Sequence, residues 1–267
     1  MQHFSFATSK DGTRIAYESR GDGPPLVMVH GSTVDRTCWG QGVETLEEHF
    51  TLHLVDRRGR GGSGDGPIYG IEREFEDVAA VVDCLEAPVR VFAHSYGAIC
   101  SLHAALLTPN IAKLVLYEPP MRVAGAKLPS APDLQDRLDD ALARGDRQAV
   151  VETFLREVVM VAEDVLAGLK QSRGWSVRLS TAHTLPRELR AASRLEFAPE
   201  TFRAMHVPTL VLKGGKSPAM FRASSSMTHQ ALANSRIEVL AGHGHSAMST
   251  GPEVCLAHIV PFLMTTE

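Results

Sequence analysis

The chain has 267 residues, of which 44% are hydrophobic and 22% are charged, and its formal net charge is −4. This ordinary composition excludes a disordered or fibrous protein, and the length suits one large α/β domain or two smaller domains. Acidic and basic residues are mixed along the chain without a long basic stripe, so we expect no nucleic-acid partner.

Cysteine spacing and hydropathy bear on the cellular compartment. The four cysteines lack the C-x-x-C spacing of a metal site, and we expect them to be buried thiols of a reducing compartment: Cys38, Cys84, Cys100 and Cys255. The N-terminus lacks the basic start and apolar run of a signal peptide, and no apolar run approaches the roughly 20 residues of a membrane helix. These features predict a soluble, cytoplasmic protein that does not bind a membrane.

The first predicted elements form a β-hairpin. Residues 4–8 and 14–19 alternate between two faces, and Asp11-Gly12 supplies a turn between them. Short apolar runs then recur, and such runs are typical of strands buried on both faces of a parallel sheet: 26–29, 52–55, 89–93, 114–117, 209–212 and 237–240. Helical periodicity between several of them, as at 75–85 and 99–106, predicts a sheet covered by helices on both sides.

The alternation breaks between residues 121 and 204, where strand character is weak. Ser130 is a candidate N-cap for a first helix, Gly145 ends it, and Asp146 caps the next. We therefore divide the chain into a core domain of residues 1–120 and 205–267 and a helical insertion of residues 121–204.

The strand at 89–93 runs directly into His94-Ser95-Tyr96-Gly97 and a helix, which is typical of a nucleophile elbow. Such a sharp turn needs small residues two positions from the serine, here Ala93 and Gly97. The alternative is that Ser95 only caps a helix. In the elbow, the backbone N–H of Tyr96 would stabilise an oxyanion, and Ser32, which follows the strand end at His30-Gly31, would supply the second N–H.

A base is expected on the loop after the last strand, at Gly242-His243-Gly244-His245. A histidine there could reach Ser95 over the edge of the sheet. We favour His245 over His243, which would then line the site or face solvent.

Four segments in this order resemble the α/β-hydrolase superfamily in its cap-bearing branch: 27–31, 56–63, 93–97 and 242–245. The resemblance implies an α/β-hydrolase fold, with a mostly parallel eight-stranded sheet flanked by helices and a helical cap inserted after the sixth strand. It also implies the chain order nucleophile, acid, histidine, and neither a metal nor an organic cofactor.

The acid departs from the usual family pattern. Most members of the family resemble one another in carrying an Asp after the strand here predicted at 209–212, but this chain has Ser217, which with Pro218 predicts a helix start. Some family members place the acid after the preceding strand, which makes Glu118 the candidate. Otherwise Glu118 faces solvent at the entry to the cap. Asp56 is a weaker candidate for the acid, and we expect it to brace the loop that follows it. Asp35 is another candidate that we expect to support a loop.

A serine at the elbow favours acyl chemistry, whereas dehalogenases and epoxide hydrolases of this fold resemble each other in using Asp. We expect a catalytic Ser95, His245 and Glu118 acting on an ester, thioester or lactone of a hydrophobic small molecule. The alternatives are an acyltransferase, lyase or cyclase of secondary metabolism on the same triad, and a ligand-binding or signalling protein on a hydrolase scaffold. A homodimer through an apolar patch of the cap is compatible with the sequence.

The cap is expected to select the substrate. Five cap residues could line an apolar pocket or pack between helices: Phe154, Leu155, Met160, Trp175 and Leu179.

Overall fold

The computed structural model describes residues 4–85, 88–122 and 131–265. Within these ranges the chain builds one eight-stranded sheet in the order β1-β2-β4-β3-β5-β6-β7-β8. β1 and β2 form the predicted hairpin, β2 pairs antiparallel with β4, and the remaining pairs are parallel. The strands are β1 Ser5–Thr8, β2 Arg14–Arg20, β3 Pro25–Val29, β4 Thr51–Val55, β5 Val89–His94, β6 Ile111–Tyr117, β7 Thr209–Gly214 and β8 Ser235–Leu240.

Because side chains alternate along each strand, they pack into two hydrophobic layers, one on each face of the sheet. In β3, Val27 and Val29 pack under α2 and α3, while Leu26 and Met28 pack on the opposite face against α1 and α11. Every one of these four side chains is fully buried, as expected for a parallel sheet covered on both faces. The helices of this part are α1 Gly42–Glu47, α2 Ile71–Asp83, α3 Tyr96–Ala104, α9 Ala219–Ala231, α10 Ala247–Thr250 and α11 Pro252–Met264. The predicted α/β-hydrolase fold is confirmed.

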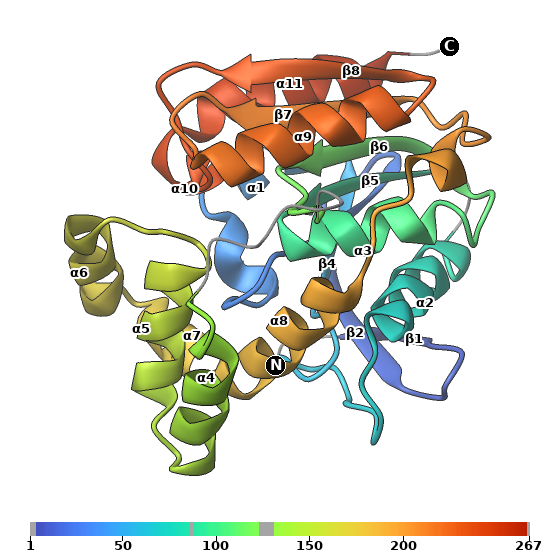
Figure 1. Ribbon diagram of the computed structural model, residues 1–267. Coiled ribbons are helices and arrows are strands. Elements are labelled where there is room, and N and C mark those ends of the chain that lie inside the picture. Colours follow the sequence, from blue (N-terminus) through green and yellow to red (C-terminus); the bar gives the residue numbers. More distant parts are fainter. Residues whose placement is uncertain (1–3, 86–87, 123–130, 266–267) are drawn as a thin grey trace.

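Between β6 and β7 the chain forms a group of helices that we call the cap, which stands apart from the sheet and meets the rest of the fold where α8 lies beside α2 (Figure 1). The cap has a hydrophobic cluster of its own. Its helices are α4 Leu134–Ala143, α5 Arg147–Glu157, α6 Glu163–Gln171, α7 Trp175–Ser180 and α8 Leu185–Arg194. Three short 3-10 helices complete the described fold: Arg36–Trp39, Ala182–Thr184 and Pro199–Phe202. The domain boundaries at 121 and 204 stay a prediction.

Two predicted helix ends are reproduced in the cap. Gly145 has a φ of 74° after α4, and the side chain of Asp146 accepts a hydrogen bond from the N–H of Ala149 at 2.9 Å at the start of α5. The predicted N-cap Ser130 lies outside the described residues, and α4 begins only at Leu134.

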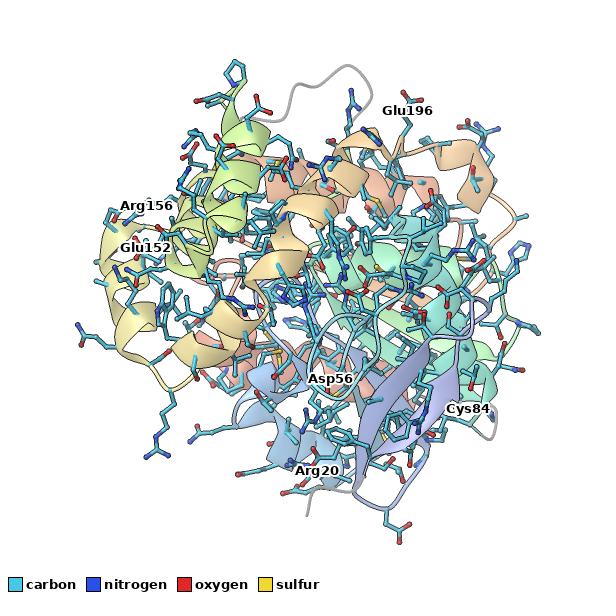
Figure 2. All side chains as sticks on the ribbon, turned by 90° about the horizontal axis from the view of Figure 1, so that it is seen from below. Arg20, Asp56, Cys84, Glu152, Arg156 and Glu196 are labelled. Carbon is cyan, nitrogen blue, oxygen red and sulfur yellow. The ribbon has the colours of Figure 1, made fainter. Side chains whose placement is uncertain are left out.

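The prediction of four buried thiols is wrong for Cys84, which is exposed at the C-terminal end of α2, near the rim of the molecule (Figure 2). Cys100 and Cys255 are buried, and Cys38 is partly exposed.

Candidate active site

Ser95 is the single residue between β5 and α3, and its backbone is strained. Its φ and ψ are 54° and −122°, a combination that residues with a Cβ rarely adopt. The N–H of Ser95 is held by the carbonyl of Tyr117 at 2.8 Å. The turn therefore presents the Ser95 hydroxyl at the N-terminus of α3, above the carboxyl ends of the strands.

The elbow approaches β3 so closely that two positions require glycine. A Cβ on Gly97 would lie 2.4 Å from the carbonyl oxygen of His30, and one on Gly31 would lie 2.9 Å from the Cβ of Ser95. Ala93, the departure from the usual glycine, is fully buried in the core. The pattern that predicted the elbow thus has a direct steric cause.

His245 follows β8 and faces Ser95, with its Nε2 atom 3.0 Å from the Ser95 Oγ. Its ring stacks on Phe221 at a centroid distance of 4.0 Å, and its carbonyl oxygen accepts a hydrogen bond from Nε2 of His94 at 2.9 Å. Burial, and then the neighbouring His245, lower the pKa of His94 well below its ordinary value, so His94 is neutral at pH 7. His243 lies instead against Gly251, away from Ser95.

Glu118 follows β6 and completes a hydrogen-bonded chain with His245 and Ser95. Its Oε2 lies 2.6 Å from Nδ1 of His245, and its Oε1 accepts the N–H of Gly214 at 2.7 Å. The Glu118 side chain is fully buried, so the alternative that it faces solvent is wrong. A carboxylate on Nδ1 leaves Nε2 of the neutral ring as an acceptor toward the serine hydroxyl.

The other carboxylate candidates lie elsewhere. Asp56 accepts hydrogen bonds from Arg36 and from the N–H of Gly62, so it braces the loop after β4. Asp35 caps a 3-10 helix through the N–H of Thr37 at 2.9 Å.

Ser217 is not the predicted helix cap. The helix α9 begins at Ala219 with Pro218 in the capping position, and the buried hydroxyl of Ser217 has no hydrogen-bond partner among the described residues.

The two predicted oxyanion-hole residues, Ser32 and Tyr96, line the same cavity as Ser95. Tyr96 is the first residue of α3, so its N–H has no acceptor within the helix. The carbonyl of Gly31 accepts hydrogen bonds from Nδ1 of His30 at 2.8 Å and from Arg57 at 3.1 Å. Because C=O and N–H point in opposite directions across a trans peptide, the N–H of Ser32 is turned away from these two donors.

A buried charge network joins the cap to this loop, and the sequence analysis missed it. Glu188 of α8 is fully buried and accepts hydrogen bonds from Arg57 at 2.7 Å, from Arg60, and from the Ser32 hydroxyl at 2.7 Å. Burial alone would raise the pKa of Glu188, but the charges of Arg57 and Arg60 outweigh it and lower that pKa. Only the clustering of Arg57 and Arg60 hinted at such a network, because their partner lies about 130 residues away in sequence.

A cavity of about 160 Å³ lies between the cap and the sheet and opens onto Ser95 and His245. Phe154 and Leu155 line it and also belong to the cap cluster, so both predicted roles hold for them, whereas Trp175 and Leu179 pack against that cluster. The sequence analysis missed several further lining residues: Val158, Leu189, Met220, Phe221, Met248, Arg122 and Arg178. A cavity of this size accommodates a group about as large as benzene.

The described residues contain neither a metal-binding cluster nor a membrane-spanning helix. Among these residues, no three His, Cys, Asp or Glu side chains are grouped in a way that could hold a metal ion. No helix within residues 4–85, 88–122 and 131–265 combines the length and hydropathy that crossing a membrane requires.

Comparison with known proteins agrees with this architecture. The structure superposes on an alpha/beta hydrolase from Sphaerobacter thermophilus with a TM-score of 0.87 and 37% sequence identity, over 97% of this chain and 100% of that one. The chain is 29% identical to a pimeloyl-(acyl-carrier protein) methyl ester esterase of Nitrosomonas europaea, over 90% of this chain and 95% of the relative. It is 26% identical to a non-heme haloperoxidase of Rhodococcus erythropolis, over 97% and 98% of the two chains. Residues 26–257 match the model of the alpha/beta hydrolase family, and the chain therefore belongs to that family.

Proposed function

We propose that this alpha/beta hydrolase family member cleaves a small carbonyl substrate, an ester, thioester or lactone, through an acyl-enzyme on Ser95. The observation that carries the proposal is the continuous hydrogen-bonded chain from Ser95 through His245 to Glu118. The resemblance to a methyl ester esterase over most of both chains supports the same chemistry.

In the proposed first half-reaction, the Ser95 Oγ attacks the carbonyl carbon while Nε2 of His245 takes the hydroxyl proton. Glu118 holds the ring in the required tautomer and stabilises the imidazolium that forms. The carbonyl oxygen becomes an oxyanion between the N–H groups of Ser32 and Tyr96. When the bond to the leaving group breaks, His245 donates its proton to that group and the acyl-enzyme remains.

In the second half-reaction, water takes the place of the leaving alcohol or thiol. His245 removes a proton from the water, the resulting oxyanion occupies the same two N–H groups, and the Ser95 ester bond breaks as His245 returns the proton to Oγ. The products are a carboxylic acid and an alcohol or thiol, and no cofactor enters the proposed steps.

The test is labelling with a fluorophosphonate probe, followed by intact mass measurement. We expect one adduct on the wild type and none on Ser95→Ala. The matched control is Ser246→Ala, because Ser246 is a second, exposed serine that lines the same cavity beside the histidine. Normal labelling of this control together with loss in Ser95→Ala supports the proposal. A folded wild type that takes no label contradicts it and favours the alternative of a binding protein.

A further inference from the structure

The wall of the active-site cavity carries two arginines that have no carboxylate partner among the described residues. Arg178 of α7 and Arg122, which follows β6, both line the cavity that contains Ser95. Within the described part of the chain, no carboxylate oxygen lies within 4.0 Å of either guanidinium group. The undescribed segment 123–130, next to Arg122, contains no acidic residue in its sequence.

Several other arginines in the protein do have a carboxylate partner. The buried Arg57, Arg58 and Arg60 each donate to at least one buried carboxylate. On the outer rim of the cap, Arg156 lies beside Glu152, with an N–O distance of 3.0 Å (Figure 2). Arg178 differs from these four arginines because it is partly buried and has no counter-ion among the described residues.

Arg178 makes a single hydrogen bond to the described residues: its Nη1 donates to the Thr33 hydroxyl at 2.5 Å. A guanidinium carries five N–H donors, so most of its hydrogen-bonding capacity is left to a ligand or to solvent. Burial lowers the pKa of Arg178, and the neighbouring Cys38 only partly compensates. An anion bound at this place would relieve the cost of burying the charge.

Arg178 shares its cavity with the reacting centre. Both Arg178 and Ser95 line that cavity, and Thr33, the partner of Arg178, lies two residues after Gly31, whose backbone packs against the Cβ of Ser95. An anionic group on Arg178 would therefore lie in the same cavity as a carbonyl carbon attacked by Ser95.

The remaining cavity wall fits a short apolar chain that ends in an anion. Among the described residues its only acidic lining residue is Glu188, which is already bonded to Arg57 and Arg60 and does not neutralise Arg178 or Arg122. Phe154 and Leu155 provide apolar surface for methylene groups.

We propose that Arg178 binds a carboxylate on the acyl part of the substrate, so that the preferred substrates are half-esters of short dicarboxylic acids. The inference rests on the proposed hydrolase function of Ser95. The reaction it implies is plain hydrolysis: water is consumed, the ester C–O bond breaks, and a dicarboxylate and an alcohol are released.

The experiment compares kcat/KM for three charged esters with kcat/KM for neutral esters of matched length: monomethyl succinate, glutarate and adipate against methyl butanoate, pentanoate and hexanoate. For at least one pair, we expect the wild type to prefer the half-ester by about 10- to 100-fold, the effect of one charge-assisted hydrogen-bonded contact. Arg178→Gln should remove that preference, mainly through a higher KM for the half-ester. Arg156→Gln, the same substitution outside the cavity, should leave both values unchanged.

A second measurement does not depend on turnover. Free glutarate should slow fluorophosphonate labelling of the wild type and fail to slow that of Arg178→Gln, while the uncharged glutaramide slows neither. The carboxylate site is overturned if kcat/KM is equal for the charged and neutral ester of every pair, or if dicarboxylates of all three lengths fail to slow labelling. In either case, labelling of Ser95 would still support the hydrolase function. Loss of labelling in the folded wild type would instead overturn the proposed function itself.

Discussion

Glu118 and His245 are hydrogen-bonded at 2.6 Å although the acid follows β6 rather than β7. The two strands are direct neighbours, and the N–H of Glu118 donates to the carbonyl of Leu212 in β7. The same Glu118 carboxylate also accepts the N–H of Gly214, at the end of β7. Because the carboxyl ends of these strands lie side by side, a carboxylate from either one can serve the same histidine.

The strained backbone of Ser95 should be measurable as stability. Ser95→Ala and Ser95→Gly both lack the hydroxyl, but only glycine adopts a φ of 54° without a Cβ clash. We expect Ser95→Gly to have a free energy of unfolding about 1 kcal/mol higher than Ser95→Ala. Urea denaturation of the two variants gives this difference, and a more stable alanine variant would show that Ser95 is not strained.

Gly97 should not tolerate a side chain. A Cβ there would lie 2.4 Å and 2.6 Å from the backbone oxygens of His30 and Val29, so Gly97→Ala must push α3 away from β3. We expect a loss of at least about 2 kcal/mol in the free energy of unfolding, together with much slower fluorophosphonate labelling. The control is Gly168→Ala, because Gly168 lies inside α6 with no atom near the added Cβ. That variant should be more stable by about 0.5 to 1 kcal/mol, and similar losses in both variants would refute the steric account.

Glu188 should stabilise the contact between the cap and the loop after β3 that carries Ser32. Glu188→Gln leaves Arg60 buried without its carboxylate partner, and we expect a loss of about 3 kcal/mol in the free energy of unfolding at pH 7. Glu152→Gln, which breaks only partly exposed pairs with Arg156 and Lys170, should cost less than about 1 kcal/mol.

The effect of Glu188 should also depend on pH. The folded-state pKa of Glu188 is lowered, so its contribution is fully present above the unfolded value of about 4.3 and is lost as the pH falls through the folded value. The difference between wild type and Glu188→Gln should therefore be constant above pH ~4.3 and shrink below it. A difference that widens in acid would contradict the assigned direction of the shift.

His94 should make the protein less stable in mild acid. Its pKa is well below the ordinary 6.5, so between those two values the unfolded chain binds a proton that the folded protein excludes. The free energy of unfolding should fall as the pH drops below about 6.5, with His94 contributing up to about 1.4 kcal/mol per pH unit. Urea titrations from pH 7.5 to 5.5 should show a shallower slope for His94→Gln, and an unchanged slope would mean that His94 titrates normally.

The fold could be predicted because its signals are local. The runs at 26–29 and 89–93 are almost wholly apolar, with Arg90 as the exception, and such runs are typical of strands in a parallel sheet that is covered on both faces. The elbow was predictable because a backbone with positive φ at Ser95, tight against β3, restricts residue size at positions adjacent in sequence. The first residue of a helix could not be predicted where it depends on the geometry of the preceding loop, as the wrong N-cap prediction at Ser217 shows.

The cavity was predicted less well because its chemistry comes from distant segments. Glu188 meets Arg57 and Ser32 only after the cap folds back over the sheet, and no local pattern marks such a contact. Arg178 lies between Val177 and Leu179 in a short helix, where a guanidinium in a cavity and one in solvent have the same sequence signature.

The kinetics of Glu118→Gln with a neutral ester test the central claim most directly. The substitution would keep the size of the side chain and remove the charge that stabilises an imidazolium, so we expect kcat to fall by about 10³- to 10⁴-fold with little change in KM. Glu196→Gln, an exposed site outside the cavity, is the control and should retain full activity. A fall of this size, with fluorophosphonate labelling slowed in parallel, is the result that the Ser95–His245–Glu118 account predicts. A folded Glu118→Gln protein with kcat within 10-fold of the wild type would contradict it.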